Sequence, residues 1–128
     1  RAQELATDFV QNPIDEFALY GIGITSQMNG KTVDAVDAYK KVLKVNPTFF
    51  PAYSSLALAY EGIHQTDDAI SALKKAVELN TTDASVYNNL GVLYFKNNKR
   101  TDARICFEKA LSIDVNYQEA QQNLKKVS

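Results

Sequence analysis

The sequence predicts an all-α fold in which three antiparallel helix pairs stack into a single α-solenoid. Apolar residues recur at helical spacing along most of the 128 residues. The whole pattern repeats at an interval of 34 residues, which is long enough for one helix pair with its connections. Residue pairs such as Asn29-Gly30 and Asn46-Pro47 separate the apolar runs, and residues of these types stop helices. One pair cannot bury its own apolar face, so neighbouring pairs must stack.

Each helix is predicted from its own apolar stripe and from the residues at its ends. Residues 1–12 form a short amphipathic helix, and Asp15 caps the helix that follows. The second helices of the first two pairs begin at Thr32 and behind the caps Thr66 and Asp67. The first helix of the third pair is predicted to end at about residue 96, and the second to run from about 101 to 113. A last helix is predicted over 118–128.

Corresponding positions of the three pairs carry residues of the same kind. One aligned position of the first helices always carries glycine or alanine. We interpret it as the place where the two helices of a pair approach each other. The large residues of the second helices are expected to reach into the next pair. The aligned core sets are Leu19/Tyr53/Tyr87, Ile22/Leu56/Leu90, Gly23/Ala57/Gly91, Ser26/Tyr60/Tyr94, Ala35/Ala69/Ala103, Tyr39/Leu73/Phe107 and Val42/Ala76/Ala110.

This pattern resembles the tetratricopeptide repeat, a helix-turn-helix unit of 34 residues with the same alternation of large and small positions. The resemblance implies a right-handed solenoid whose first helices line a concave groove. Ser26 stands where tyrosine is usual, and Thr81 and Val115 replace the closing proline. The alignment divides the single domain 1–128 into the end of a preceding unit (1–15), three repeats (16–49, 50–83 and 84–117) and a capping helix (118–128).

Composition excludes several classes of partner and site. The 14 basic and 15 acidic side chains leave a formal charge of -1, so nucleic acid is not expected as a partner. No apolar run is long enough for a membrane span, so membrane insertion is not expected. One cysteine allows no intrachain disulfide, which fits a reducing compartment such as the cytoplasm and leaves the periplasm open. The chain begins with Arg1, so we expect it to be a trimmed fragment.

The sequence predicts neither a catalytic centre nor a metal or cofactor site, so we expect no enzyme. His64 is the sole histidine and falls in the expected turn of the second pair, where a solvated side chain is the simplest interpretation. Cys106 lies between apolar residues on a predicted helix, which favours a structural thiol.

A second apolar stripe on the first helix of the first pair indicates a binding surface. A surface helix normally has one apolar face, and the stripe adds another. By the resemblance, the first helices line the groove, which would be apolar at the N-terminal end and polar further along. The candidate groove residues are Phe17, Tyr20, Ile24, Gln27, Met28, Ser54, Leu58, Glu61, Ser85, Asn88, Asn89, Val92, Phe95, Lys96 and Gln122.

These features predict a protein-protein interaction scaffold that binds a peptide or helix of a partner in the groove. Chaperone-binding members of the family hold a C-terminal carboxylate with lysine, arginine and asparagine, and neither register of this sequence reproduces that set. Asn89 and Asn123 are expected to grip a peptide backbone instead. One alternative is self-association through the Phe17/Tyr20/Met28 patch or an open end of the array. Another is an accessory repeat array of a larger protein. A helix that covers Phe17 and Tyr20 would account for the second stripe without any groove.

Overall fold

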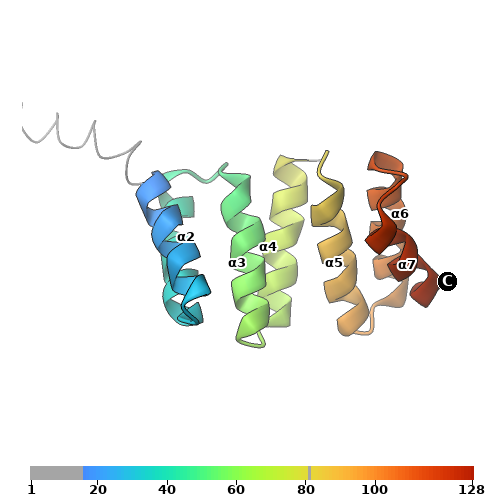
Figure 1. Cartoon of the computed structure of the whole chain (residues 1–128), viewed down its shortest axis with the longest axis horizontal. Coiled ribbons are helices and arrows are strands. Elements are labelled where there is room, and N and C mark those ends of the chain that lie inside the picture. Colours follow the sequence, from blue (N-terminus) through green and yellow to red (C-terminus); the bar gives the residue numbers. More distant parts are fainter. Residues whose placement is uncertain (1–15, 81) are drawn as a thin grey trace, which may run out of the picture.

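The computed structural model describes residues 16–80 and 82–128, and almost all of them are helical or in short turns between helices (Figure 1). The predicted helix over residues 1–12 and the cap Asp15 lie outside the described residues. Residues 16–28 form the described part of the first helix. The later helices are α2 (Thr32–Val45), α3 (Phe50–Gly62), α4 (Thr66–Leu79), α5 (Ala84–Lys96), α6 (Arg100–Ile113) and α7 (Gln118–Val127).

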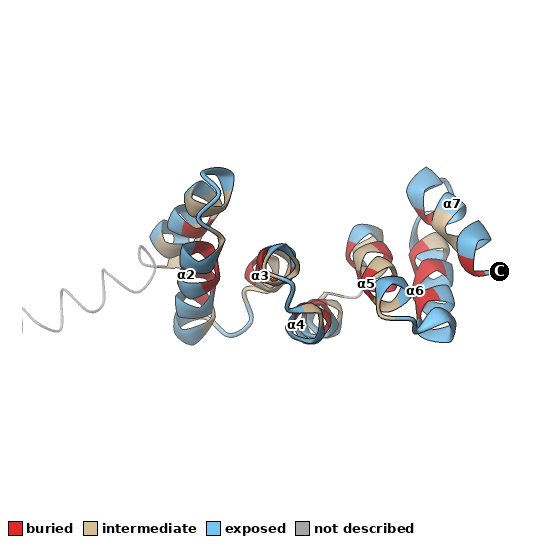
Figure 2. Ribbon diagram, turned by 90° about the horizontal axis from the view of Figure 1, so that it is seen from below, coloured by how far each residue is buried: buried red, intermediate tan, exposed pale blue. Residues whose placement is uncertain are grey.

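The helices form an array of antiparallel pairs that follows the chain from one end to the other (Figure 1). Each helix packs on its neighbours in sequence, and α7 contacts both α6 and α5. Seen from below, the pairs lie side by side, and buried residues gather where helices face each other (Figure 2). No strand occurs in the described ranges, so the predicted helical repeat array is confirmed, with α7 as its C-terminal helix.

Helix starts differ from the prediction in one respect. The predicted caps Thr66 and Asp67 lie inside α4, where Gln65 is the N-cap residue and makes no side-chain cap bond. The prediction of these caps was therefore wrong. A side-chain cap does occur at α5, where the Asp83 carboxylate accepts hydrogen bonds from the Ser85 amide at 3.0 Å and from its hydroxyl at 2.6 Å.

Left-handed backbone occurs at one repeated position in the turns within the helix pairs. Gly30, His64 and Asn98 have φ values of 78°, 62° and 62°, and they align at the 34-residue interval. A left-handed residue commonly ends a helix and turns the chain, and glycine and asparagine adopt this conformation most readily. His64 is exposed in this turn, so its position follows from the turn and requires no chemical role.

Close approach within a pair depends on the glycines that the alignment identified. A Cβ atom on Gly91 would lie 2.6 Å from Cε1 of Phe107, and one on Gly23 would lie 2.4 Å from Cε1 of Tyr39. The rings therefore lie directly against the glycines of their own pair. Phe107 also lies in one packed cluster with Val127 and Leu124 of α7, so this ring reaches the next unit as expected.

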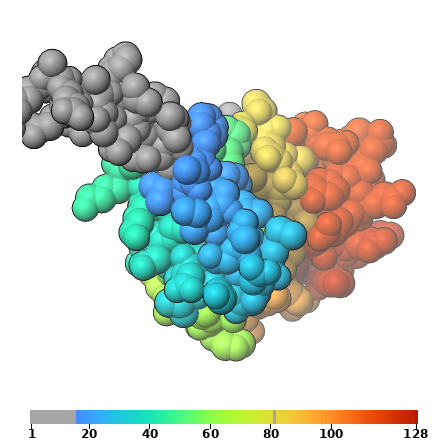
Figure 3. Space-filling view, turned by 60° about the vertical axis from the view of Figure 1, so that its left-hand side comes forward, coloured from blue at the N-terminus to red at the C-terminus, as the bar shows by residue number. Residues whose placement is uncertain are grey.

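Ile22 departs from the predicted core. Leu56 and Leu90 occupy the same repeat position and are 5% and 4% exposed, whereas Ile22 is 56% exposed. Inside the array this position is covered by the helix pair on its N-terminal side, and the described part of the chain contains no pair before the first. Figure 3 looks onto that end, with the first pair in blue to cyan at the front. The assignment of Ile22 to the core was therefore wrong.

Candidate functional site

Hydrogen bonds link the first helices of consecutive units, and the two bonded residues are always 35 positions apart in the sequence. The Tyr20 hydroxyl and Ser55 Oγ lie 3.0 Å apart across the first two units. Asn123 Nδ2 in α7 donates to Asn88 Oδ1 in α5 at 3.0 Å. The separation is one residue more than the 34-residue repeat. Each residue of a first helix therefore meets the residue that follows its equivalent in the next unit.

The same position between α3 and α5 is occupied by Ser54 and Asn89, and there the bond is missing. The aligned pairs are Tyr20–Ser55, Ser54–Asn89 and Asn88–Asn123. Among the described residues, no hydrogen bond joins Ser54 to Asn89, whose side chain is half-buried. The serine side chain is too short to cross the space that tyrosine or asparagine crosses in the other two interfaces. A small pocket opens at this one interface.

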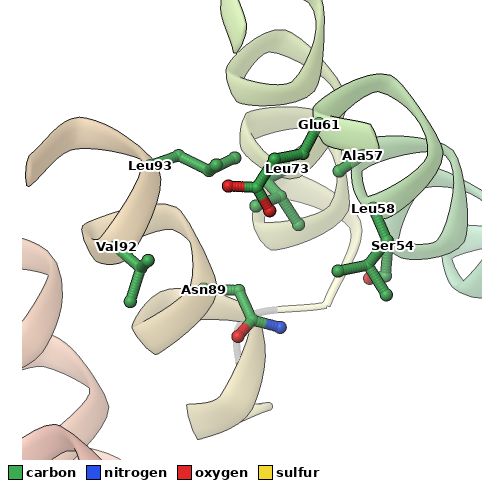
Figure 4. A pocket seen from close by; sticks show the side chains of 8 residues that line it. All are labelled: Ser54, Ala57, Leu58, Glu61, Leu73, Asn89, Val92 and Leu93. Carbon is green, nitrogen blue, oxygen red and sulfur yellow. The ribbon is translucent and has the colours of Figure 1, made fainter. Parts of the chain in front are cut away.

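The pocket between α3 and α5 has a mostly aliphatic wall and a small cavity volume of about 50 Å³. Ser54 and Asn89 lie near one end, and Glu61 and Leu93 lie near the other (Figure 4). The residues that line it are Ser54, Ala57, Leu58, Glu61, Leu73, Asn89, Val92 and Leu93. We call this set the α3–α5 pocket.

An ion pair lies at the Glu61 end of the α3–α5 pocket. Lys96 Nζ of α5 donates to Glu61 Oε2 of α3 at 2.6 Å, again between residues 35 positions apart. The Glu61 side chain is partly buried and the Lys96 side chain is more exposed. The pair neutralises the charges nearest the pocket and holds the two first helices together at this end.

The structure brings five predicted groove residues together in the α3–α5 pocket and adds three that the sequence reasoning missed. The predicted residues are Ser54, Leu58, Glu61, Asn89 and Val92, with Lys96 paired to Glu61 beside them. Ala57, Leu73 and Leu93 were assigned to the core or not considered. The 35-residue relation between first helices would have identified Leu93, because it is the partner position of Leu58.

Asn88 was predicted to line the groove, and this prediction was wrong. Its side chain is fully buried and accepts its hydrogen bond from Asn123, which was itself expected to grip a peptide. Asn88 Nδ2 has no partner within the described ranges. Both asparagines therefore hold α7 against α5, and neither is available to a ligand in this arrangement.

Tyr20 and Gln27 are both held by contacts with other side chains. Gln27 Oε1 accepts a 2.7 Å hydrogen bond from the Tyr39 hydroxyl. The Tyr20 ring packs edge-on against Phe49 with centroids 5.2 Å apart, and Phe17 packs against the same ring at 6.0 Å. Burial, followed by the nearby Tyr20 hydroxyl, raises the pKa of Tyr39, which keeps it a hydrogen-bond donor. Much of the predicted apolar stripe is thus an aromatic cluster.

Other predicted groove residues lie outside the α3–α5 pocket. Phe95 is exposed, and the Arg100 guanidinium lies 6.0 Å from its ring. Ile24 is half-buried against the core. The exposed members that contribute to neither the aromatic cluster nor the pocket are Met28, Ser85 and Gln122.

Titratable groups form no reactive centre in the described part of the chain. Burial, together with the nearby Asp102 carboxylate, raises the pKa of the buried Cys106 thiol to about 11. A raised pKa lowers the thiolate fraction at neutral pH and makes the thiol a poor nucleophile. Over residues 16–80 and 82–128, no group of three His, Cys, Asp or Glu residues is placed to hold a metal ion.

No helix in the described ranges has both the length and the apolar character needed to cross a membrane.

Comparison with protein-family models gives matches along nearly all of the described chain. Tetratricopeptide repeat models match residues 17–48, 38–71 and 84–117, and a TPR repeat model matches residues 65–98. A search of curated proteins gave no match.

Solved structures with the same arrangement of helices include two TPR domains and the protein MamA. The first TPR of Spaghetti (RPAP3) bound to HSP90 peptide SRMEEVD is 26% identical, with a TM-score of 0.84 over 88% of this chain and 90% of that one. The first TPR domain of human RPAP3 is 27% identical, with a TM-score of 0.82 over 90% and 91%. MamA protein is 32% identical with a TM-score of 0.84 over 88% of this chain, which spans 62% of the MamA chain.

Proposed function

We propose that this chain, which belongs to the tetratricopeptide repeat family, is a non-enzymatic scaffold that binds a segment of a protein partner along its first helices. The bound segment would lie across α3 and α5, and its capture would help to assemble a larger complex. Repeat arrays of this kind offer extended surfaces to other chains, which fits such a role.

The observation that carries this proposal is the open interface between Ser54 and Asn89. Two of the three aligned interfaces close this position with a hydrogen bond of 3.0 Å, and the third leaves a pocket beside a half-buried amide. A side-chain amide offers two donors and one acceptor, so Asn89 can pair with the backbone of an incoming peptide. The aliphatic wall next to it supplies an anchor site for one apolar side chain.

The relative with a bound peptide supports a protein ligand for this chain. The residues of this chain argue against the same acidic peptide. The Spaghetti (RPAP3) domain holds an acidic peptide, SRMEEVD. A carboxylate needs free cations in the groove. At the positions where the family's chaperone-binding members carry lysine, arginine and asparagine, this chain has Tyr20, Ile24, Ser55, Ser85 and Asn89, none of them basic. We therefore expect a different class of peptide to bind here.

Panning of a display library of random twelve-residue peptides tests the proposal. Ser54→Tyr should fill the α3–α5 pocket and bond to Asn89, as Tyr20 bonds to Ser55 in the first interface. Ser71→Tyr is the matched control, because it adds the same ring at an exposed position of α4. Peptides recovered on the wild type and on Ser71→Tyr should bind at least about tenfold more weakly to Ser54→Tyr, a loss of about 1.4 kcal/mol.

The proposal fails if no recovered peptide is sensitive to Ser54→Tyr. Circular dichroism of the three proteins should show the same helix content, so that a lost peptide reports the pocket and not the fold.

Self-association is the second candidate function, and the exposed Ile22 favours it. In the interior of the array the same position is almost completely buried against a preceding pair. A second copy of the chain could supply that cover and end the array in a dimer. Sedimentation velocity at increasing protein concentration tests this candidate. If the protein stays monomeric at a concentration about 100 times a micromolar Kd, a dimer of that affinity is rejected. Attachment to a catalytic domain elsewhere in a longer protein is the third proposal.

A further inference from the structure

We infer that the segment bound in the α3–α5 pocket is an uncharged, extended stretch of another protein that carries one aliphatic side chain. This inference rests on the proposed function and adds the chemistry of the partner. Three properties of the pocket carry it, namely its wall, its amide and its charge.

The wall of the α3–α5 pocket fits an aliphatic side chain. Leu58 projects from α3, Val92 and Leu93 belong to α5, and Ala57 and Leu73 complete the lining. Leu58 is 54% exposed, so apolar surface remains open for a partner to cover. Covering aliphatic surface with a valine, leucine or isoleucine side chain removes both from water, whereas a polar side chain there would lose its own hydration without compensation.

The Asn89 amide favours an extended ligand over a helical one. The amide lies next to the aliphatic wall, so a peptide that inserts a side chain there brings its own backbone close to Asn89. In an extended segment the backbone N–H and C=O groups are free to pair with that amide. In the middle of a helix these groups are already bonded within the helix, and Asn89 would stay unpaired.

The charges around the α3–α5 pocket select against acidic ligands. Glu61 is the only ionisable residue among those that line it, and its carboxylate is already bonded to Lys96 at 2.6 Å. An incoming carboxylate in the pocket would lie next to the negative Glu61, and the charge of Lys96 is already balanced by that partner. An uncharged segment meets no such repulsion at this end of the pocket. The Glu61–Lys96 pair thus acts as a charge filter next to the apolar anchor site.

The sequences of the peptides recovered by panning test the first part of the inference. Among peptides that are lost on Ser54→Tyr, we expect valine, leucine or isoleucine to be enriched and aspartate and glutamate to be depleted. Ser54-dependent peptides rich in acidic residues would overturn the inference and leave the proposed function standing. Absence of any Ser54-dependent peptide would remove both.

The charge filter is tested with a peptide pair and one substitution. A recovered peptide and its variant with glutamate next to the aliphatic residue are titrated into the wild type, which should prefer the uncharged form. Glu61→Gln frees Lys96 and should shift the ratio of the two affinities toward the acidic form by about 2- to 5-fold, the range expected for an exposed ion pair.

Glu78→Gln is the control for this titration, because it removes the same charge from the surface pair of Lys75 and Glu78. That variant should leave the ratio of affinities as in the wild type. If the wild type and Glu61→Gln showed the same ratio of affinities for the uncharged and the acidic peptide, the proposed charge filter would be overturned.

Discussion

Gly91 and Phe107 illustrate how the pairing of two residues sets the distance between helices. The first and third pairs combine glycine with an aromatic ring, Gly23 with Tyr39 and Gly91 with Phe107. The second pair combines Ala57 with Leu73 at the same two positions. A methyl group gained on one helix is thus matched by a smaller side chain on the other, as close packing of the interior requires.

Gly91→Ala should destabilise the protein by up to about 2 kcal/mol. Overpacking costs about 1–3 kcal/mol, and the better helix propensity of alanine returns about 1 kcal/mol of it. The cost arises because the fully buried Phe107 ring has no free space to move into. Urea unfolding followed by circular dichroism measures the change in the free energy of unfolding.

Gly21→Ala is the control for Gly91→Ala, because no atom lies within 4 Å of a Cβ added there. It should stabilise the protein by up to about 1 kcal/mol through helix propensity alone. The double variant Gly91→Ala/Phe107→Leu reproduces the combination of the second pair and should be more stable than the sum of the single effects. Equal effects of alanine at positions 21 and 91 would contradict the packing argument.

At the scale of single elements, α7 shows how a helix with one apolar side is held in place. Ala120 and Val127 are buried, and the Arg100 side chain donates to the Lys126 carbonyl at 2.7 Å. Asn123 adds the hydrogen bond to the buried Asn88. The last helix therefore closes the array with an apolar stripe and one buried polar contact, and its outer face stays polar.

Asn123→Ala should lower the free energy of unfolding by about 1–3 kcal/mol, because it removes the donor that pairs with Oδ1 of the buried Asn88. Gln122→Ala is the control one residue earlier, where the side chain is exposed and should contribute less than about 0.5 kcal/mol. Urea midpoints of the two variants, measured side by side, give the comparison. Equal midpoints would mean that the Asn88–Asn123 bond contributes nothing to the docking of α7.

The predicted groove shows why single helices are not enough to identify a site. The helical periodicity grouped Leu58, Asn89 and Val92 from local spacing alone, and all three line the α3–α5 pocket. It could not separate Asn88 from Asn89, because these are neighbours in sequence and only the packing of α7 buries one of them. The bond of Tyr20 to Ser55 in the second pair and that of Gln27 to Tyr39 within the first pair were hidden for the same reason.

At the scale of the whole molecule, the array has two different ends. The C-terminal end is covered by α7, and the N-terminal end of the described chain exposes Ile22, which interior pairs bury as Leu56 and Leu90. A position in a repeat protein therefore takes its burial from its neighbours in the stack, and the described residues contain no pair on the N-terminal side of the first one.

Ile22→Ala and Leu56→Ala should differ strongly although they align. The interior substitution removes a buried side chain and should cost about 2–5 kcal/mol, whereas the terminal one should cost less than about 1 kcal/mol. Thermal and urea unfolding of both variants measure the difference. A loss at Ile22 as large as that at Leu56 would show that another element covers the N-terminal end, and sedimentation of the same sample would then show whether a second copy supplies it.

The sequence by itself determined the helical class, the repeat interval and the places where two helices approach, because these follow from spacing and from the volume of side chains at fixed positions. Only the tertiary structure decided which polar residues of the first helices are free. Their partners lie 35 residues away on separate helices, and stacking with a shift of one position brings them together. The pocket at Ser54 and Asn89 exists because that shift pairs two side chains too short to meet.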